Sequence, residues 1–127
     1  MDLEEIWVYN QSTQLGEEVW DIVIPWDYFG KDTIGKQLVR SADSIAANLS
    51  EGFGRYHFKE TKQFGYYSRG SLYETKTWLL KAKNRKLISE VKFTSPVSEI
   101  NQIGKMLNAY IKSLGKTTDQ YSTSNHQ

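Results

Sequence analysis

The sequence predicts an all-α protein, an antiparallel up-down-up-down four-helix bundle. Apolar residues recur at helical spacing in four segments, residues that start or stop helices bound each segment, and no segment alternates like a strand. The chain has 127 residues, of which 39% are hydrophobic and 24% charged, a balance that suits one domain. The connections between segments span roughly 5–12 residues, which favours antiparallel neighbours.

The first helix is predicted over residues 4–24. Its apolar face consists of Val8, Ser12, Leu15, Val19, Ile22 and Val23. This stripe stops at Pro25, because a residue that precedes proline is pushed out of helical geometry.

The second helix is predicted to begin at Asp32 and to end near Glu51. Asp32 is the expected N-cap, since its side chain can accept hydrogen bonds from free backbone N–H groups. The apolar face consists of Ile34, Leu38, Ala42, Ile45 and Leu49. Gly52 and Gly54 are expected to stop the helix, because glycine readily takes left-handed geometry.

The third helix is predicted over residues 59–83 and is the longest. Its expected core face consists of Phe64, Tyr67, Ser71, Thr75, Trp78 and Ala82. Surplus apolar residues lie on its other sides and near the first helix: Tyr66, Leu72, Tyr73, Leu79, Leu80, Trp7, Trp20 and Trp26. Exposed apolar surface of this kind is typical of an interface, although large rings can also simply cover a thin bundle.

Ser95 and Pro96 predict the start of the fourth helix, because serine is a favoured N-cap and proline is favoured at the first helical position. Its apolar face consists of Ile100, Ile103, Leu107, Tyr110, Ile111 and Leu114, and Gly115 is expected to end it. Residues 1–115 are therefore expected to form the single bundle domain. The polar residues 116–127 are expected to form a disordered tail.

The residue types that many enzymes and metal sites need are scarce. The chain has no Cys and only two His, His57 and His126, so it has neither disulfides nor thiolate chemistry. A di-metal centre in a bundle needs Glu-x-x-His on two helices, and no Glu here has a His three residues later. No nucleophile–base pair or cofactor loop is evident. We expect no catalytic residue, no metal and no cofactor.

A polar ribbon runs along the second helix, and two polar residues one turn apart on the third helix are its candidate partners. The ribbon consists of Arg40, Ser44, Asn48, Glu51 and Arg55, and the partners are Ser71 and Glu74. We favour a buried structural network of Arg40, Asn48, Glu51, Ser71 and Glu74, since an unpaired buried polar group costs about 1–3 kcal/mol. A solvated helix side and a ligand site are the alternatives.

Charge is distributed unevenly along the chain, although the net charge is only +1. Residues 1–30 hold seven acidic residues and no Lys or Arg, whereas residues 55–92 hold ten basic residues and three acidic ones. This layout fits a basic patch for polyanions, or acidic and basic faces that meet inside an assembly.

Seven basic residues are our candidates for nucleic-acid contact: Arg55, Lys59, Lys62, Lys81, Lys83, Arg85 and Lys86. Aromatic residues lie among them, and their role would be to neutralise phosphates without selecting bases. The helix dipole also favours cations at the end of the third helix, which explains much of the Lys81–Lys86 cluster without any ligand.

The order of residues between positions 40 and 75 resembles a known family. Arg40 to Arg55 reads RSADSIAANLSEGFGR, and Phe64 and the sequence RGSLYET at 69–75 follow. These motifs closely resemble the bacterial four-helix bundle family of 23S rRNA intervening-sequence proteins, which includes the accessory variability protein of diversity-generating retroelements. The resemblance covers about residues 4–115.

The resemblance implies a small non-enzymatic bundle that often assembles as a ring of five subunits, a pentamer. In the retroelement branch it implies a basic adaptor that binds nucleic acid and a reverse transcriptase; in the rRNA branch it implies no defined activity. This chain departs from the basic retroelement branch, because it is nearly neutral and its first helix is acidic. A head-to-tail ring needs two complementary patches on each subunit, which an acidic first helix and a basic third helix would supply.

We therefore expect a cytoplasmic, non-enzymatic homo-oligomeric scaffold or adaptor that binds RNA or DNA through its basic patch. The alternative is a protein–protein interaction module that binds no nucleic acid. We expect no membrane contact, because no stretch reaches the roughly 20 apolar residues of a membrane span and the first residues do not resemble a signal peptide.

Overall fold

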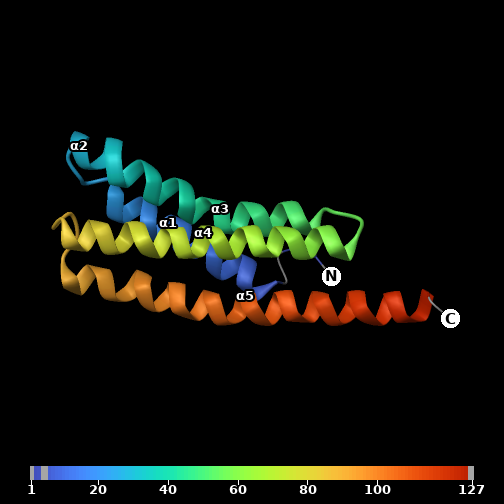
Figure 1. Cartoon of the computed structure of the whole chain (residues 1–127). Helices are drawn as coiled ribbons and strands as arrows, with labels where there is room; N and C mark the ends of the chain where they lie inside the picture. The colour runs from blue at the N-terminus through green and yellow to red at the C-terminus, as the bar shows by residue number, and fades with distance from the viewer. Residues whose placement is uncertain (1, 4–5, 126–127) are drawn as a thin grey trace.

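The computed structural model describes the backbone of residues 2–3 and 6–125, and the side chains of these residues as far as Leu114. Within this part of the chain the elements are α1 (Trp7–Val23), α2 (Tyr28–Gly30), the π-helix η2 (Lys31–Gly35), α3 (Lys36–Phe53), α4 (Phe58–Asn84) and α5 (Glu90–Asn125) (Figure 1). Because α2, η2 and α3 follow one another without a break, they form one rod beside α1, α4 and α5. The predicted all-α four-helix bundle is confirmed.

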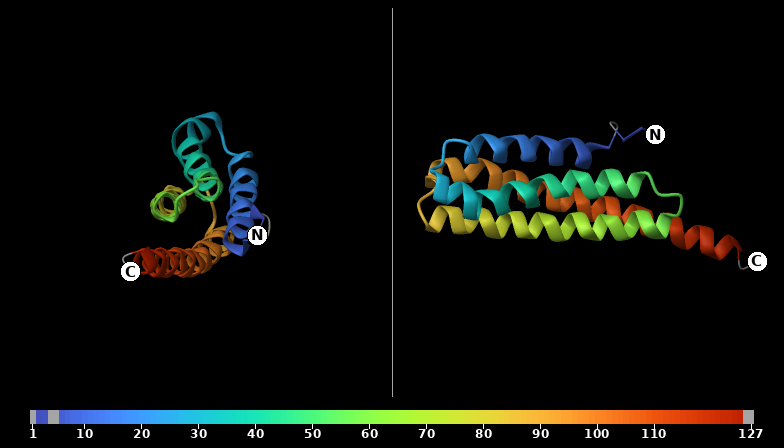
Figure 2. Two further views of the ribbon diagram at one scale, coloured as in Figure 1. Left: turned by 90° about the vertical axis from the view of Figure 1, so that its right-hand side faces the viewer. Right: turned by 90° about the horizontal axis from the view of Figure 1, so that it is seen from above.

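The four rods form a square in which each rod has two close neighbours. α3 packs against α4, α4 packs against α5, and α1 closes the square against α3 and α5. Seen along the bundle, α1 and α4 lie at opposite corners (Figure 2). Faces that point outward from α1 and from α4 therefore point in opposite directions.

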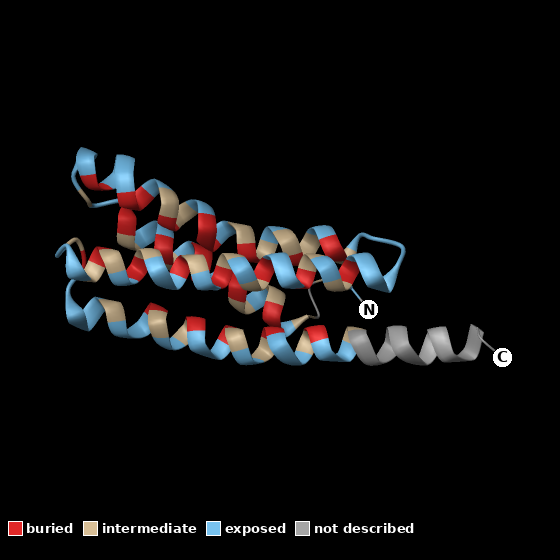
Figure 3. Ribbon diagram, in the orientation of Figure 1, coloured by how far each residue is buried: buried red, intermediate tan, exposed pale blue. Residues whose placement is uncertain are grey.

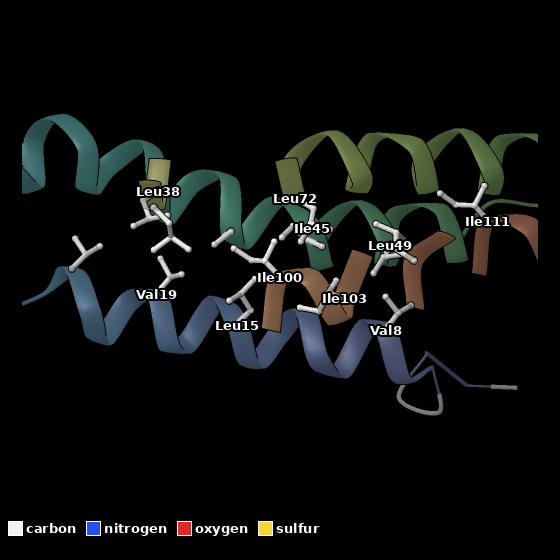
Figure 4. Packing of buried hydrophobic residues seen from close by; sticks show 14 residues of the cluster. Val8, Leu15, Val19, Leu38, Ile45, Leu49, Leu72, Ile100, Ile103 and Ile111 are labelled. Carbon is white, nitrogen blue, oxygen red and sulfur yellow. The ribbon is translucent and has the colours of Figure 1, made fainter. Parts of the chain in front are cut away.

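The apolar stripes predicted for the first, second and fourth helices meet in one core. Val19 and Val8 of α1 point toward Leu38 and Leu49 of α3 (Figure 4). Between them, Leu15 points toward Ile45 of α3 and Ile100 of α5. Buried residues follow the inward side of each rod (Figure 3). Helical periodicity therefore located the core faces of these three rods.

The predicted core face of α4 is confirmed at Thr75 and Ala82 and is otherwise wrong by about one residue of rotation. The residues that α4 buries are Thr61, Gly65, Ser68, Leu72, Thr75, Leu79 and Ala82. The first three are small, because α4 approaches its neighbours closely: a Cβ on Gly65 would lie 2.9 Å from Ile111 Cγ1 of α5. Large rings such as Tyr67 do not fit there and lie at the side of the contact, half exposed.

The second rod begins earlier than predicted. Asp27, not Asp32, is the N-cap: its Oδ1 accepts a hydrogen bond of 3.0 Å from the N–H of Gly30. Asp32 lies inside η2 and pairs with Lys36 one turn later at 3.3 Å. Both Asp27 and Asp32 follow the turn at Pro25, and Asp27, which comes first in the chain, caps the helix. Asp32 then lies within the helix, where it forms an ion pair one turn along.

The prediction that glycine ends this helix, α3, through left-handed geometry is wrong. No glycine in the described part of the chain has a positive φ, and Gly54 caps α3 with φ −78°. Gly52 is instead a point of close approach, where an added Cβ would lie 2.7 Å from Phe64 Cβ and 3.1 Å from the Thr61 carbonyl oxygen of α4.

The fourth rod also begins earlier than predicted, at Glu90 rather than at Pro96. Ser89 caps it, because its hydroxyl oxygen accepts a hydrogen bond of 3.1 Å from the N–H of Lys92. The extra turns bring Phe93 against the core, and the ring of Pro96 is itself buried. Burial of these apolar groups offsets the backbone hydrogen bond that a proline inside a helix removes.

The backbone of α5 is helical as far as Asn125, so the predicted end at Gly115 is wrong. A single glycine inside a helix costs about 1 kcal/mol and does not by itself stop it. That residues 116–127 form a disordered tail stays a prediction, with residues 126–127 and the side chains of 115–125 outside the described residues. Residues 4 and 5 of the predicted first helix also lie outside them.

Among the described residues, no helix combines the length and the apolar run that crossing a bilayer requires.

Two glycines provide a matched test of the close contact between α3 and α4. Gly52→Ala is expected to lower the free energy of unfolding by about 1–3 kcal/mol, because the new methyl group overpacks the contact with Phe64. Gly70→Ala is the control: it lies on the exposed side of α4 with nothing within 4 Å of an added Cβ. That substitution is expected to raise the free energy of unfolding by about 0.5–1 kcal/mol. Urea unfolding measures both, and equal effects would contradict the close contact.

Candidate interaction surfaces

Hydroxyl groups of α4 bind the backbone of α3 along the boundary between the two helices. The Thr61 hydroxyl donates to the Gly52 carbonyl oxygen at 2.9 Å, and the Ser68 hydroxyl donates to the Ile45 carbonyl oxygen at 2.8 Å. Thr61 and Ser68 are buried, so these bonds satisfy polar groups that water does not reach.

Two further hydroxyl pairs extend this row. The hydroxyl oxygens of Thr75 and Ser41 lie 3.0 Å apart in the buried interior, and those of Ser71 and Ser44 lie 3.0 Å apart in a half-buried position. We call the row formed by Thr61, Ser68, Ser71 and Thr75 with their α3 partners the hydroxyl seam. Four of its residues were in no predicted site: Ser41, Thr61, Ser68 and Thr75. The signal that identifies the α4 members is their spacing of three, four and seven residues.

Among the five residues of the predicted polar network, Arg40 and Glu74 form an ion pair between α3 and α4. Arg40 also donates to Gln37 Oε1 at 3.1 Å, and Trp78 Nε1 donates to Glu74 Oε2 at 3.0 Å. Glu74 therefore accepts hydrogen bonds from the guanidinium group of Arg40 on α3 and from the indole of Trp78 on α4.

The other three residues fall into two separate groups. Asn48 Nδ2 donates to the carbonyl and hydroxyl oxygens of Ser44 at 2.8 and 2.9 Å, and Ser44 contacts Ser71. Among the described residues Glu51 pairs only with Arg55, four residues later, at 2.7 Å, and both side chains are about half exposed. Geometry thus places the five residues in three groups rather than in one network.

The seven basic candidates also separate, into two clusters at opposite ends of α4. The α3–α4 turn cluster consists of Arg55, Lys59 and Lys62, and the α4–α5 turn cluster consists of Lys81, Lys83, Arg85 and Lys86. At the helical rise of 1.5 Å per residue, Lys62 and Lys81 lie about 28 Å apart along the axis. They do not form one continuous patch.

The two clusters differ in whether their basic side chains form ion pairs with acidic residues. In the α3–α4 turn cluster, Arg55 pairs with Glu51, and its guanidinium lies 4.9 Å from the centre of the Phe64 ring. In the part of the chain that the structure describes, no member of the α4–α5 turn cluster pairs with a carboxylate. Only Lys83 has an aromatic contact, with its Nζ 4.9 Å from the Phe93 ring centre.

Backbone geometry fixes the α4–α5 turn cluster. Lys86 has φ 62°, in the left-handed region, and its N–H donates to the Lys83 carbonyl oxygen at 3.0 Å. The N–H of Leu87 donates to the Ala82 carbonyl oxygen at 2.9 Å. These two bonds are those of a Schellman C-cap, which ends α4 and holds its basic residues at a defined turn.

Acidic residues collect where α1 meets α5. An open pocket of about 750 Å³ lies there, and its lining includes Glu18, Asp21 and Trp26 together with Lys92 of α5. Nearby, Glu99 of α5 faces Glu18, and the Glu99 Oε2 atom is buried without a hydrogen-bond donor. The hydrogen bond that Glu18 shares with protonated Glu99, then burial, raise the pKa of Glu99 to about 7. When Glu99 is ionised, the two carboxylates have no proton between them, and the buried Oε2 atom is then left without a donor.

Metal ligands do not gather in the described part of the chain: it contains no group of three His, Cys, Asp or Glu side chains that could hold an ion.

Large apolar side chains remain on the surface. Trp7 is 74% exposed, Trp20 52% and Tyr73 62%. The predicted surplus is wrong for Leu72 and Leu79, which are buried in the core, and Trp26 is half-buried against it. Exposed apolar surface is therefore real, but aromatic rings supply more of it than leucines do.

Fold and surface together define an all-α bundle protein. The family model for the 23S rRNA-intervening sequence protein matches residues 4–109. The chain therefore belongs to the family of 23S rRNA-intervening sequence proteins, as the resemblance of its motifs predicts.

One solved structure is similar over most of both chains. It is a crystal structure of a protein of unknown function from the S23 ribosomal protein family of Bacteroides thetaiotaomicron, with a TM-score of 0.74 and 21% sequence identity. The similarity covers 83% of this chain and 98% of that one, and it shows a shared fold. No curated protein matches the chain in sequence.

The Glu18–Glu99 pair predicts a stability that depends on pH. Glu99 has a folded-state pKa of about 7, above its ordinary 4.5, so the folded protein binds more protons than the unfolded chain between these values. The free energy of unfolding is expected to fall as pH rises from about 4.5 to about 7. Glu99→Gln is expected to remove this part of the pH dependence and to raise the melting temperature at pH 7.5. Calorimetry across this range checks it; identical profiles for both proteins would contradict the pairing.

Proposed function

We propose that this protein is a non-enzymatic, homo-oligomeric scaffold that assembles through its exposed apolar side chains. The observation that carries the proposal is the exposure of large rings on more than one side of the bundle, among them Trp7, Trp20, Tyr67 and Tyr73. Such side chains are enriched at protein interfaces, and covering them removes apolar surface from water.

The opposed charges of α1 and α4 support a head-to-tail arrangement. α1 carries Glu18 and Asp21, and it lies diagonally across the bundle from α4 (Figure 2). On α4, Tyr73, Lys76 and Arg69 lie at the boundary with α5, where Lys76 Nζ donates to Asn101 Oδ1 at 3.0 Å and Arg69 donates to Asn108 Oδ1 at 3.2 Å. A head-to-tail ring requires two different, complementary patches on each subunit, and a ring of five is the form that the family resemblance favours.

The mass of the protein in solution tests the assembly. Light scattering after gel filtration is expected to show an oligomer, and Glu18→Lys with Asp21→Lys is expected to shift it toward smaller species, because like charges then meet across the interface. Lys112→Glu on α5 is the control for a charge reversal elsewhere. A wild-type protein that is monomeric at all concentrations and salt conditions would contradict the scaffold.

A second candidate function is the binding of RNA or DNA at the α4–α5 turn cluster. It is favoured by one observation: four cations lie within six residues of chain, and none has a carboxylate partner among the described residues. The α3–α4 turn cluster is a weaker candidate, because Glu51 already neutralises Arg55. Contacts from such a turn would be to phosphates and would not select bases.

Nucleic-acid binding is testable by salt dependence. If four phosphates are neutralised, affinity for single-stranded RNA is expected to fall about 50-fold for a fourfold rise in salt. Replacing Lys81, Lys83, Arg85 and Lys86 with Gln is expected to abolish this dependence, whereas Lys59→Gln with Lys62→Gln is expected to retain most of it. If the wild-type protein binds no RNA at physiological salt, the protein–protein interaction module is the better description.

A further inference from the structure

A groove with an apolar floor lies on the outer side of the boundary between α1 and α3. Its volume is about 440 Å³. Trp20, Ile24 and Val39 supply apolar side chains, and Lys31, Lys36 and Arg40 supply positive charges. Trp20 is 52% exposed and Ile24 48% exposed, so both retain considerable apolar surface to bury. The outer face formed by α1 and α3 is therefore apolar and positively charged at the end where this groove lies.

The same face becomes acidic farther along the boundary. Asp43 of α3 lies against α1, where a Cβ added to Gly16 would be 2.8 Å from Asp43 Oδ1. Burial, and secondarily the charge of Glu17 on α1, raise the pKa of Asp43. Glu17 and Asp43 are thus two acids on one face, and no described cation forms an ion pair with either of them.

The register of α1 against α3 places these two ends symmetrically. At one end Gly35 lies beside Val23, and at the other end Gly16 lies beside Asp43. Between these two contacts, Trp20 and Val39 line the groove. Val39 is therefore near the middle of the face. Lys36 and Asp43 lie on either side of it, each about 5 Å away along the axis of α3.

We propose that this face binds a second copy of the chain about a two-fold axis that passes close to Trp20 and Val39, with α1 and α3 antiparallel to their counterparts. Each Lys36 then faces Asp43 of the other copy, and Trp20 and Val39 pack at the centre. The proposal rests on the homo-oligomer proposed above and names one of its contacts. A parallel pairing would place like charges together and is disfavoured.

The remaining charges near the face are compatible with this pairing. Arg40, the cation nearest the axis, is already neutralised by Glu74 of α4. Asp21 lines the pocket between α1 and α5 and so points away from the face. Asp32 holds Lys36 at 3.3 Å, but both side chains are about half exposed or more, so exchanging this pair for one with Asp43 of the other copy costs little.

The contact also leaves the outer side of α4 free, because α4 lies diagonally across the bundle from α1 (Figure 2). It therefore joins two protomers, and breaking the contact in such a dimer halves the mass.

Charge exchange tests the pairing. In light scattering, Lys36→Glu and Asp43→Lys are each expected to halve the wild-type mass, and the double variant is expected to restore it, because residue 36 again faces an opposite charge at residue 43. Lys112→Glu serves as control and is expected to keep the wild-type mass. Circular dichroism of each variant establishes that it is folded.

Cross-linking provides a second measurement that does not alter charge. The chain has no Cys, so Val39→Cys introduces a single thiol beside the proposed axis. A short bis-maleimide is expected to convert this variant to covalent dimers, and Lys112→Cys is expected to remain uncross-linked.

Each outcome bears on a different proposal. If the wild-type protein is an oligomer but the single charge reversals leave its mass unchanged, or the double variant fails to restore it, the two-fold contact is wrong and the scaffold stands. If the wild-type protein is monomeric throughout, both are wrong.

Discussion

The close approach of α3 and α4 is the constraint on which the rest of the molecule depends. At Gly52 there is no space for a methyl group beside Phe64, and the α4 side of the contact consists of small residues whose hydroxyls bind the α3 backbone. Because most of this boundary accepts only small side chains, the rings of Tyr66, Tyr67 and Tyr73 lie outside it. The exposed aromatic surface thus follows from how the core is built, and small residues inside the bundle determine what is presented outside it.

Several acidic residues of this bundle lower the stability of one subunit and have no cation partner within the part of it that the structure describes. Glu18 and Glu99 face each other at one boundary of α1, and Glu17 and Asp43 lie together at the other. Like charges at close range oppose folding at neutral pH, and no described cation pairs with these four acids. Acids left unpaired within a protomer are available to cations of another, and this links the pH dependence of folding to the proposed contacts.

Sequence periodicity was sufficient for the fold and for three of the four core faces, because large aliphatic residues dominate those faces. It was insufficient for α4, where hydroxyl and glycine residues are buried and rings are exposed, the reverse of what hydrophobicity alone indicates. Caps were ambiguous for a related reason: Asp27 and Asp32, or Ser89 and Ser95, are equivalent in type, and packing selects between them. The separation of the basic residues was implicit in the predicted length of 59–83, since a helix of that length keeps its two ends far apart. Which acids face each other across α1 depended on three-dimensional register, which one sequence does not contain.

The π-helix η2 has a consequence for how this chain tolerates change. In it the N–H of Lys36 donates to the carbonyl oxygen of Lys31, five residues earlier, so the turn holds one residue more than an α-helical turn. A deletion of one residue between 31 and 35 would convert the turn to α-helical form while leaving Leu38, Ala42 and Ile45 in phase with the core. The same deletion within α3 would rotate every later residue by about 100° and dismantle the contact with α4. A one-residue deletion in this rod is therefore expected to be tolerated in η2 and not in α3.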